Sequence, residues 1–256
     1  MPRTSAFLVL VLVAIPGLVL AQSQPTSDPT ALTLAAQSIA AMAGSVSISD
    51  VTLTGNVTWN ETDTGTAALY AKGTSESRVD LSLSGGTQSD VRNATSGSPA
   101  GSWTRNGGSP TAYAQHNCWT DAAWFFPAVS SLTQSSNPTF VFKYIGQEQH
   151  NGVTTQHIQV YQASAQNPDL QRLSTTDFYL EAGTLLPSAV AFNAHSDTDM
   201  NTDIPIEADF TSYQAVSGIQ VPFHVQQLMN GTVILDITLT SAVFNTGLSD
   251  NVFTLQ

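Results

Sequence analysis

Charged side chains are scarce in this sequence. Asp, Glu, Lys and Arg make up 10% of the 256 residues, against about 25% in an average soluble protein. Only 7 residues are Lys or Arg and 19 are Asp or Glu, so the formal net charge is −12. Binding to nucleic acid needs a clustered basic surface that contacts many phosphates. So few basic residues exclude a nucleic-acid partner.

Cysteine is almost absent, since Cys118 is the only one. The chain therefore has no intramolecular disulfide, and it must rely on the size of its core instead. We interpret Cys118 as a small buried apolar residue. Hydrophobic residues make up 41% and aromatic residues 8% of the chain, which argues against disorder.

The only long apolar run lies at the N-terminus. Arg3 precedes an uninterrupted apolar stretch over residues 6–15, Pro16-Gly17 breaks it, and small residues precede Gln22. This pattern predicts a signal peptide over residues 1–21, cleaved after Ala21. An uncleaved anchor is the alternative, but a membrane span needs roughly 20 apolar residues. We therefore predict an exported protein, periplasmic or extracellular, with a linker over residues 22–27 and a single domain over residues 28–256.

One amphipathic helix is predicted at the start of that domain. Asp28 is a helix cap, Pro29 suits the first helical position and Gly44 suits the stop. From there on the apolar residues mostly alternate with polar ones, which predicts about 11–12 antiparallel strands. Asn151-Gly152 and Asn230-Gly231 are typical of tight hairpin turns. We expect a mainly β fold, an unclosed antiparallel barrel or strongly curled sheet, with helices covering its concave face.

Four aromatic residues interrupt the strand pattern. Trp119, Trp124, Phe125 and Phe126 fall within eight residues, in a segment where we predict a short helix capped by Thr120 or Asp121. They are either ordinary core that plugs the open end of the sheet, or the lining or lid of a cavity for a hydrophobic ligand. These four residues are our candidate ligand-binding site.

Motifs for catalysis or metal binding are not evident. The sequence lacks a G-x-S-x-G elbow, a helical H-E-x-x-H pattern and any spacing that selects a pair of catalytic carboxylates. Residues 195–203 alternate oxygen-bearing side chains like the first half of a calcium loop, without its glycine and its final glutamate. We interpret this run as an acidic hairpin, and we predict no cofactor, no metal and no catalytic residue.

The acidic residues are unevenly distributed. After Arg172 the chain has no Lys or Arg, while nine Asp or Glu remain. The C-terminal third is either a surface that favours solubility or one that meets a cationic partner.

Several strand-and-turn patterns resemble a known family. The patterns are Tyr144-x-Gly146-x-Glu148, Thr184-x-Leu186-Pro187, Phe210-x-x-Tyr213, Gly218-x-x-Val221-Pro222-Phe223 and Phe244-Asn245-x-x-Leu248-Ser249-Asp250. Together, over residues 30–256, they resemble the LolA/LolB-like periplasmic lipoprotein carriers. That resemblance implies an unclosed barrel with helices over its mouth and a cavity for acyl chains. No functional residue of that family is carried over to a position in this chain.

Three hypotheses for the function follow. The first is a non-enzymatic carrier that binds a lipid or a lipoprotein acyl chain, and that contacts a membrane peripherally. The second is a secreted hydrolase of a glycan or an ester. The third is a structural or adhesive β-module without a ligand, which strands rich in Ser and Thr would permit. The sequence does not indicate an oligomeric state.

Overall fold

The computed structural model describes Met1 and residues 25–255. Most of the predicted signal peptide and residues 22–24 of the predicted linker lie outside the described residues. The remaining linker residues bind strand β7 (Phe140–His150), because the Ser27 hydroxyl accepts from the backbone N–H of Phe142 at 3.1 Å. Within the described part of the chain, the helices are all too short or too polar to span a bilayer.

The predicted N-terminal helix is confirmed as α1 (Pro29–Ala43). The Asp28 side chain accepts from the backbone N–H of Thr30 at 2.8 Å, and the N–H of Gly44 closes the last turn on Ala40. Small residues let the helix pack closely on the rest of the molecule: its buried face includes Ala31, Ala35 and Ser38 together with Met42. The larger Leu32 and Ile39 are partly buried and pack against the core from the same helix.

Within the described residues, all strands belong to one antiparallel sheet of 13 strands, slightly more than the 11–12 predicted, and the predicted open sheet is confirmed. Its order is β6-β5-β4-β3-β2-β1-β13-β12-β11-β10-β9-β8-β7, and the edge strands β6 and β7 are not paired with each other. The strands are β1 (Asp50–Trp59), β2 (Asp63–Lys72), β3 (Glu76–Leu83), β4 (Gly86–Asn93), β5 (Ala100–Arg105), β6 (Thr111–Ala112), β7, β8 (Val153–Gln162), β9 (Thr176–Glu181), β10 (Pro187–Ser196), β11 (Asp199–Val216), β12 (Ile219–Met229) and β13 (Thr232–Phe244).

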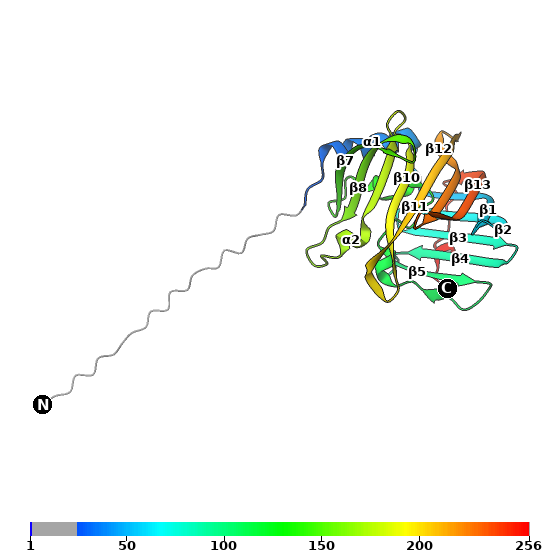
Figure 1. Ribbon diagram of the computed structural model, residues 1–256, viewed down its shortest axis with the longest axis horizontal. Helices are drawn as coiled ribbons and strands as arrows, with labels where there is room; N and C mark the ends of the chain where they lie inside the picture. Colours follow the sequence, from blue (N-terminus) through cyan, green and yellow to red (C-terminus); the bar gives the residue numbers. More distant parts are fainter. Residues whose placement is uncertain (2–24, 256) are drawn as a thin grey trace.

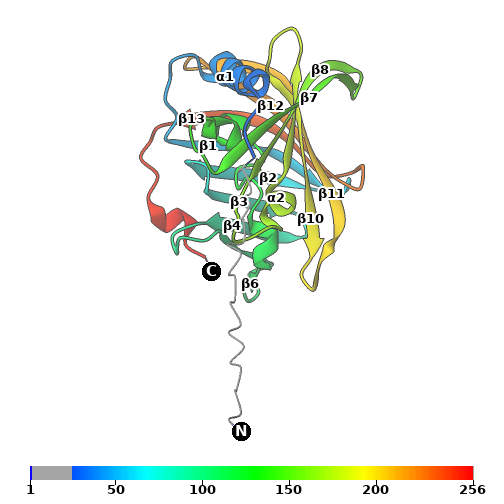
Figure 2. The ribbon, with the colours of Figure 1, turned by 90° about the vertical axis from the view of Figure 1, so that its left-hand side faces the viewer.

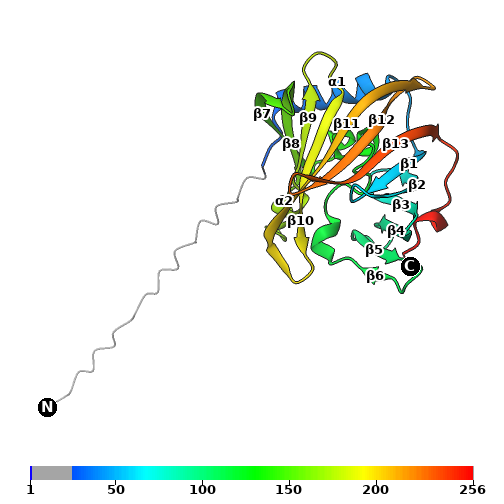
Figure 3. The same cartoon turned by 45° about the vertical axis from the view of Figure 1, so that its right-hand side comes forward.

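The sheet consists of two consecutive meanders. Strands β1–β6 form one half and β7–β13 the other, and the first strand of the chain joins them by pairing with the last. Both predicted hairpin turns are confirmed: Asn151 and Gly152, like Asn230 and Gly231, have the positive φ angles of a type I′ turn. Figures 1 and 3 show the sheet curling, so that the strands of one half cross those of the other.

The segment that contains Trp119, Trp124, Phe125 and Phe126, called the aromatic segment below, does not form the predicted helix. It forms a turn and two short 3₁₀ helices, η2 (Pro127–Val129) and η3 (Ser131–Gln134). Asp121 does not cap a helix that begins at residue 122. Its carboxylate instead accepts from the backbone N–H and the hydroxyl of Ser131, ten residues further along, both at 2.9 Å. Pro127 cannot donate within a helix interior, and it stands at the first position of η2 instead.

The core lies between the concave face of the sheet, α1 and this aromatic segment. Phe125 and Phe126 are fully buried there, together with Phe142 and Phe178 from the sheet. Figure 2 shows α1 lying across one end of the curled sheet. The helix and the aromatic segment thus fill one end of the concave side and leave the other end to the cavity described below.

The C-terminal tail packs on the first half of the sheet. After β13, the buried Asp50 carboxylate accepts from the backbone N–H groups of Thr246 and Gly247. A 3₁₀ turn, η4 (Asp250–Phe253), then buries Phe253 against β3 and β4. Strand β1 has an irregularity at Thr54-Gly55 in its pairing with β13.

Candidate functional site

A cavity of about 380 Å³ opens on the concave side of the sheet. Strands β3–β5 line it from one half of the sheet and β10–β13 from the other. The 3₁₀ helix η1 (Gln115–Cys118) and the start of the aromatic segment complete the wall. Because both halves contribute, the cavity exists only once the sheet has curled.

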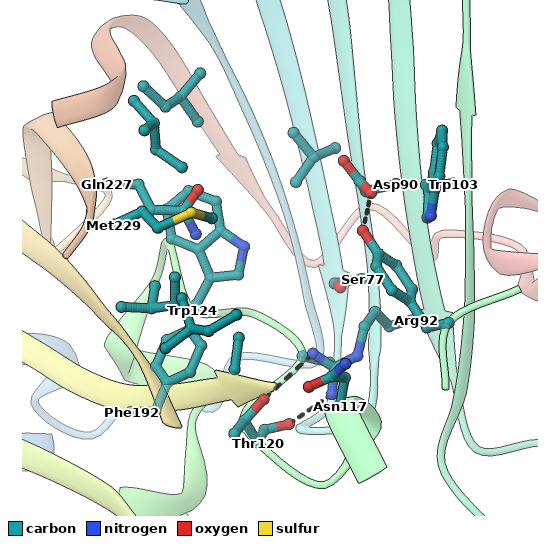
Figure 4. Close-up of a pocket in the computed structure, with 18 of the residues that line it drawn as sticks. Ser77, Asp90, Arg92, Trp103, Asn117, Thr120, Trp124, Phe192, Gln227 and Met229 are labelled. Carbon is teal, nitrogen blue, oxygen red and sulfur yellow. Dashed lines mark hydrogen bonds between the residues drawn. The ribbon is translucent and has the colours of Figure 1, made fainter. Parts of the chain in front are cut away.

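One wall of the cavity is apolar. Trp124, Phe192 and Met229 lie together there (Figure 4), and Ile206 and Leu235 belong to the same lining. Trp124 packs edge-on against the buried Phe125, with ring centroids 5.7 Å apart. This packing fixes the ring that forms the apolar wall.

The opposite wall carries charged groups. The Tyr113 hydroxyl donates to Asp90, and Arg105 lies 3.6 Å from the other oxygen of that carboxylate. Arg105 also lies over the rings of Trp103, at 4.9 Å from the centroid, and Trp59, at 6.0 Å. Burial raises the pKa of Asp90, and the Tyr113 hydrogen bond and the neighbouring arginines offset this only in part. Burial beside that carboxylate also raises the pKa of Tyr113.

A second arginine, Arg92, connects the polar wall of the cavity to the aromatic segment. Arg92 donates to the backbone carbonyl of Thr120 at 2.8 Å and to the Thr120 hydroxyl at 3.4 Å. Figure 4 shows Arg92, Asn117 and Thr120 grouped on the side of the cavity opposite Phe192 and Met229. The lining is therefore divided into a polar side and an apolar side.

A side-chain amide closes the cavity across the curled sheet. Asn117, in η1, donates to the backbone carbonyl of His195 and accepts from its backbone N–H, both at 2.8 Å. The His195 side chain is fully buried and lines the cavity. Its Nε2 atom lies 3.0 Å from both Asp203 and Arg172.

The four residues predicted as a ligand site are separated by the structure. Trp124 lines the large cavity, whereas Trp119 lines a second, polar cavity of about 250 Å³ together with Asp121. Burial raises the pKa of Asp121 to about 6, although its hydrogen bonds to Ser131 work against the shift. Phe125 and Phe126 are fully buried in the core.

Most residues of the cavity were not predicted from the sequence. Three of the four tryptophans line it, and two of these, Trp59 and Trp103, come from strands β1 and β5. The alternation in β3 does show that Val79 and Leu81 share the inner face, which is the face of the cavity. The pairing across the curl depends on tertiary structure and leaves no local pattern.

Outside the two cavities, one group of three residues resembles the hydroxyl–His–carboxylate arrangement that a hydrolase would need. On β11–β13, the Thr211 hydroxyl lies 2.9 Å from Nδ1 of His224, and Nε2 of that ring lies 3.0 Å from Asp236. These residues lie on paired strands of the sheet, next to an irregularity at Ser212, which has a positive φ and no partner in the register. The described residues also contain no cluster of three or more His, Cys, Asp or Glu able to hold a metal ion.

Comparison with known proteins was informative only at the level of structure. No protein-family model matches the sequence, and no curated protein sequence does. A domain assigned to the outer membrane lipoprotein-sorting proteins of Vibrio parahaemolyticus superposes with a TM-score of 0.56 and 12% identity, covering 88% of this chain and 96% of that one. The chain has the LolA-like fold. The resemblance seen in the sequence is thus confirmed for the fold.

Two further structures are similar to this chain. A DUF1329 family protein from Desulfovibrio piger superposes with a TM-score of 0.53 and 10% identity, covering 90% of this chain and 98% of that one. A LolA superfamily protein from Nitrosomonas europaea gives a TM-score of 0.48 and 8% identity over 88% of this chain and 97% of that one. At such identities the similarity describes the LolA-like fold alone.

Proposed function

We propose that the chain is a non-enzymatic carrier that holds a lipid, or the acyl chain of a lipoprotein, in the cavity on the concave side of the sheet. The observation that carries the proposal is the apolar wall of Trp124, Phe192 and Met229 facing a cavity of about 380 Å³. Small-molecule sites are typically clefts of about 300–1,000 Å³ with mainly apolar lining and a few polar groups. The cavity therefore suits one apolar chain.

The cellular setting is part of the proposal. Residues 1–21 act as a signal peptide, and residues 28–256 form a single exported domain in the periplasm or outside the cell. Ligand uptake then involves peripheral contact with a membrane or with another carrier. The lipoprotein-sorting assignment of the Vibrio parahaemolyticus domain supports this setting.

Native mass spectrometry tests the carrier function directly. The mature protein is delipidated in organic solvent, refolded, and titrated with a fluorescent acyl probe. We expect one bound probe per chain, with emission shifted to the blue by the apolar wall. A protein that is fully folded by circular dichroism yet binds no probe would overturn the carrier function and favour a β-module without a ligand.

A further inference from the structure

Most of the Lys and Arg side chains of this acidic protein are paired with carboxylates. Six Lys and Arg lie within the described residues, and four of them form ion pairs with carboxylates: Lys72 with Asp250, Arg78 with Asp80, Arg105 with Asp90, and Arg172 with Asp203. Lys143 is also half-buried without a carboxylate partner, but it donates to the backbone carbonyl of Thr26 and does not line the cavity. Among the described residues, Arg92 is the cation of the cavity lining that has no carboxylate within ion-pair distance.

Arg92 is held in place by uncharged groups. Its two contacts with Thr120 use one N–H on each terminal nitrogen, whereas a guanidinium offers five donors in a planar fork. The adjacent Asp90 interacts with Arg92 only through space, since that carboxylate is bound directly by Tyr113 and Arg105. Arg92 thus brings a positive charge with unused donors to the polar side of the cavity.

A second group in the same lining lacks a partner. His195 Nδ1 is buried without a hydrogen-bond partner among the described residues, although the residue lines the cavity. Its Nε2 atom lies 3.0 Å from both Arg172, which donates, and Asp203, which accepts, so either tautomer finds a partner for Nε2. A buried polar atom that remains unsatisfied is costly, and a polar group of a ligand in the cavity would remove that cost.

We propose that the ligand is a single-chain amphiphile with an anionic head, a carboxylate or a phosphate, whose head binds Arg92 while its chain lies against Trp124, Phe192 and Met229. The inference rests on the proposed carrier function and adds the charge of the ligand. The protein's net charge of −12 repels anions in general, and the exposed Asp197 adds a negative charge to the cavity lining. Selectivity for an anion must therefore come from Arg92 at short range.

The test compares three probes with the same chain, namely dodecanoate, dodecyl phosphate and dodecanol, by quenching of tryptophan fluorescence below their micellar concentrations. We expect the wild-type protein to bind at least one of the two anions about tenfold or more tightly than the alcohol, because the alcohol replaces the charged acceptor of the Arg92 guanidinium with an uncharged one. The ratio of the two anions then separates a carboxylate ligand from a phosphate ligand. Equal affinities for all three probes would overturn the anionic head while leaving the carrier function intact.

Two variants locate the effect. Arg92→Gln keeps a donor for the Thr120 carbonyl, and we expect it to lose the preference for anions because its affinity for the anions falls more than its affinity for dodecanol. Arg78→Gln is the matched control, since Arg78 pairs with Asp80 on the face of β3 turned away from the cavity-lining Ser77 and Val79, and it should keep the preference. If Arg92→Gln retains the full preference, the proposed contact is wrong. Failure of all three probes to bind the folded wild type would instead overturn the carrier function itself.

Discussion

Asn117 replaces a missing strand beside His195. Strand β9 pairs with β10 only as far as Phe192, opposite Thr176, so the last residues of β10 have no strand neighbour on that side. The Asn117 side chain satisfies both backbone groups of His195 there, across 78 positions in the sequence. One amide thus holds η1 against β10 and closes the cavity between the two halves of the sheet.

Asn117→Ala should lower the free energy of unfolding by about 1–3 kcal/mol, because two backbone polar groups lose their partner in a partly buried place. Urea denaturation measures the change. The exposed Asn56 on β1 provides a matched control, and Asn56→Ala should change the free energy by less than about 0.5 kcal/mol. Equal effects of the two variants would show that Asn117 does not hold the closure.

The two tryptophans of the aromatic segment should differ in their effect on ligand binding. Trp124 lines the large cavity and Trp119 the smaller polar one. Trp124→Ala removes a large part of the apolar wall, so we expect the affinity for an acyl probe to fall roughly tenfold or more. Trp119→Ala should leave that affinity within about threefold of wild type. Titration with one fluorescent probe measures both, and a larger loss in Trp119→Ala would place the ligand in the other cavity.

Local patterns were sufficient to predict the N-terminal helix, the hairpin turns and most strands, but not the 3₁₀ turns of the aromatic segment. The capping residue Asp28, the two Asn-Gly turns and the alternation in β3 each act within a few residues, and each prediction is confirmed. The open sheet follows from the number of strands. Helix α2 (Leu170–Ser174) was missed because five residues are too few for a periodic pattern.

The cavity was predictable only in part. The aromatic segment pointed to Trp124, but Arg92 and Trp103 reach the same place only because β4 and β5 curl toward β10.

The surface charge of the acidic C-terminal third was also predictable only in part. Its lack of Lys and Arg suggested a uniform negative surface, whereas histidines contact Asp177, Asp203, Glu207 and Asp236. Such pairs form between strands, and composition does not reveal them.

Gly101 makes room for Tyr113. A Cβ atom on Gly101 would lie 2.8 Å from Cδ2 of the Tyr113 ring and 3.0 Å from the carbonyl oxygen of Val91. Gly101→Ala should therefore displace the ring, weaken its hydrogen bond to Asp90 and destabilise the fold by about 1–3 kcal/mol. Thermal and urea denaturation measure the loss. Gly183→Ala is the control, since its Cβ would meet nothing within 4 Å, and it should be neutral or slightly stabilising.

His157 should make the stability depend on pH. Its Nδ1 atom lies 2.7 Å from Glu148 and its Nε2 atom 2.8 Å from Asp177. Burial lowers the pKa of His157, but the two carboxylates outweigh burial and raise that pKa above its usual 6.5. The stabilisation is therefore fully present below pH 6.5 and is lost as the pH rises through the pKa of the folded state.

His157→Gln tests this dependence, because glutamine keeps a hydrogen bond but does not titrate. We expect the wild type to lose free energy of unfolding as the pH rises above 6.5, and the variant to lose less. Asp209, whose pKa burial and Glu207 raise to about 6, titrates near the start of this range, but it is present in both proteins and does not contribute to the difference between them. His116→Gln should behave like wild type, since His116 contacts the backbone carbonyl of Ser196. A variant with the full pH dependence of the wild type would assign the effect to groups other than His157.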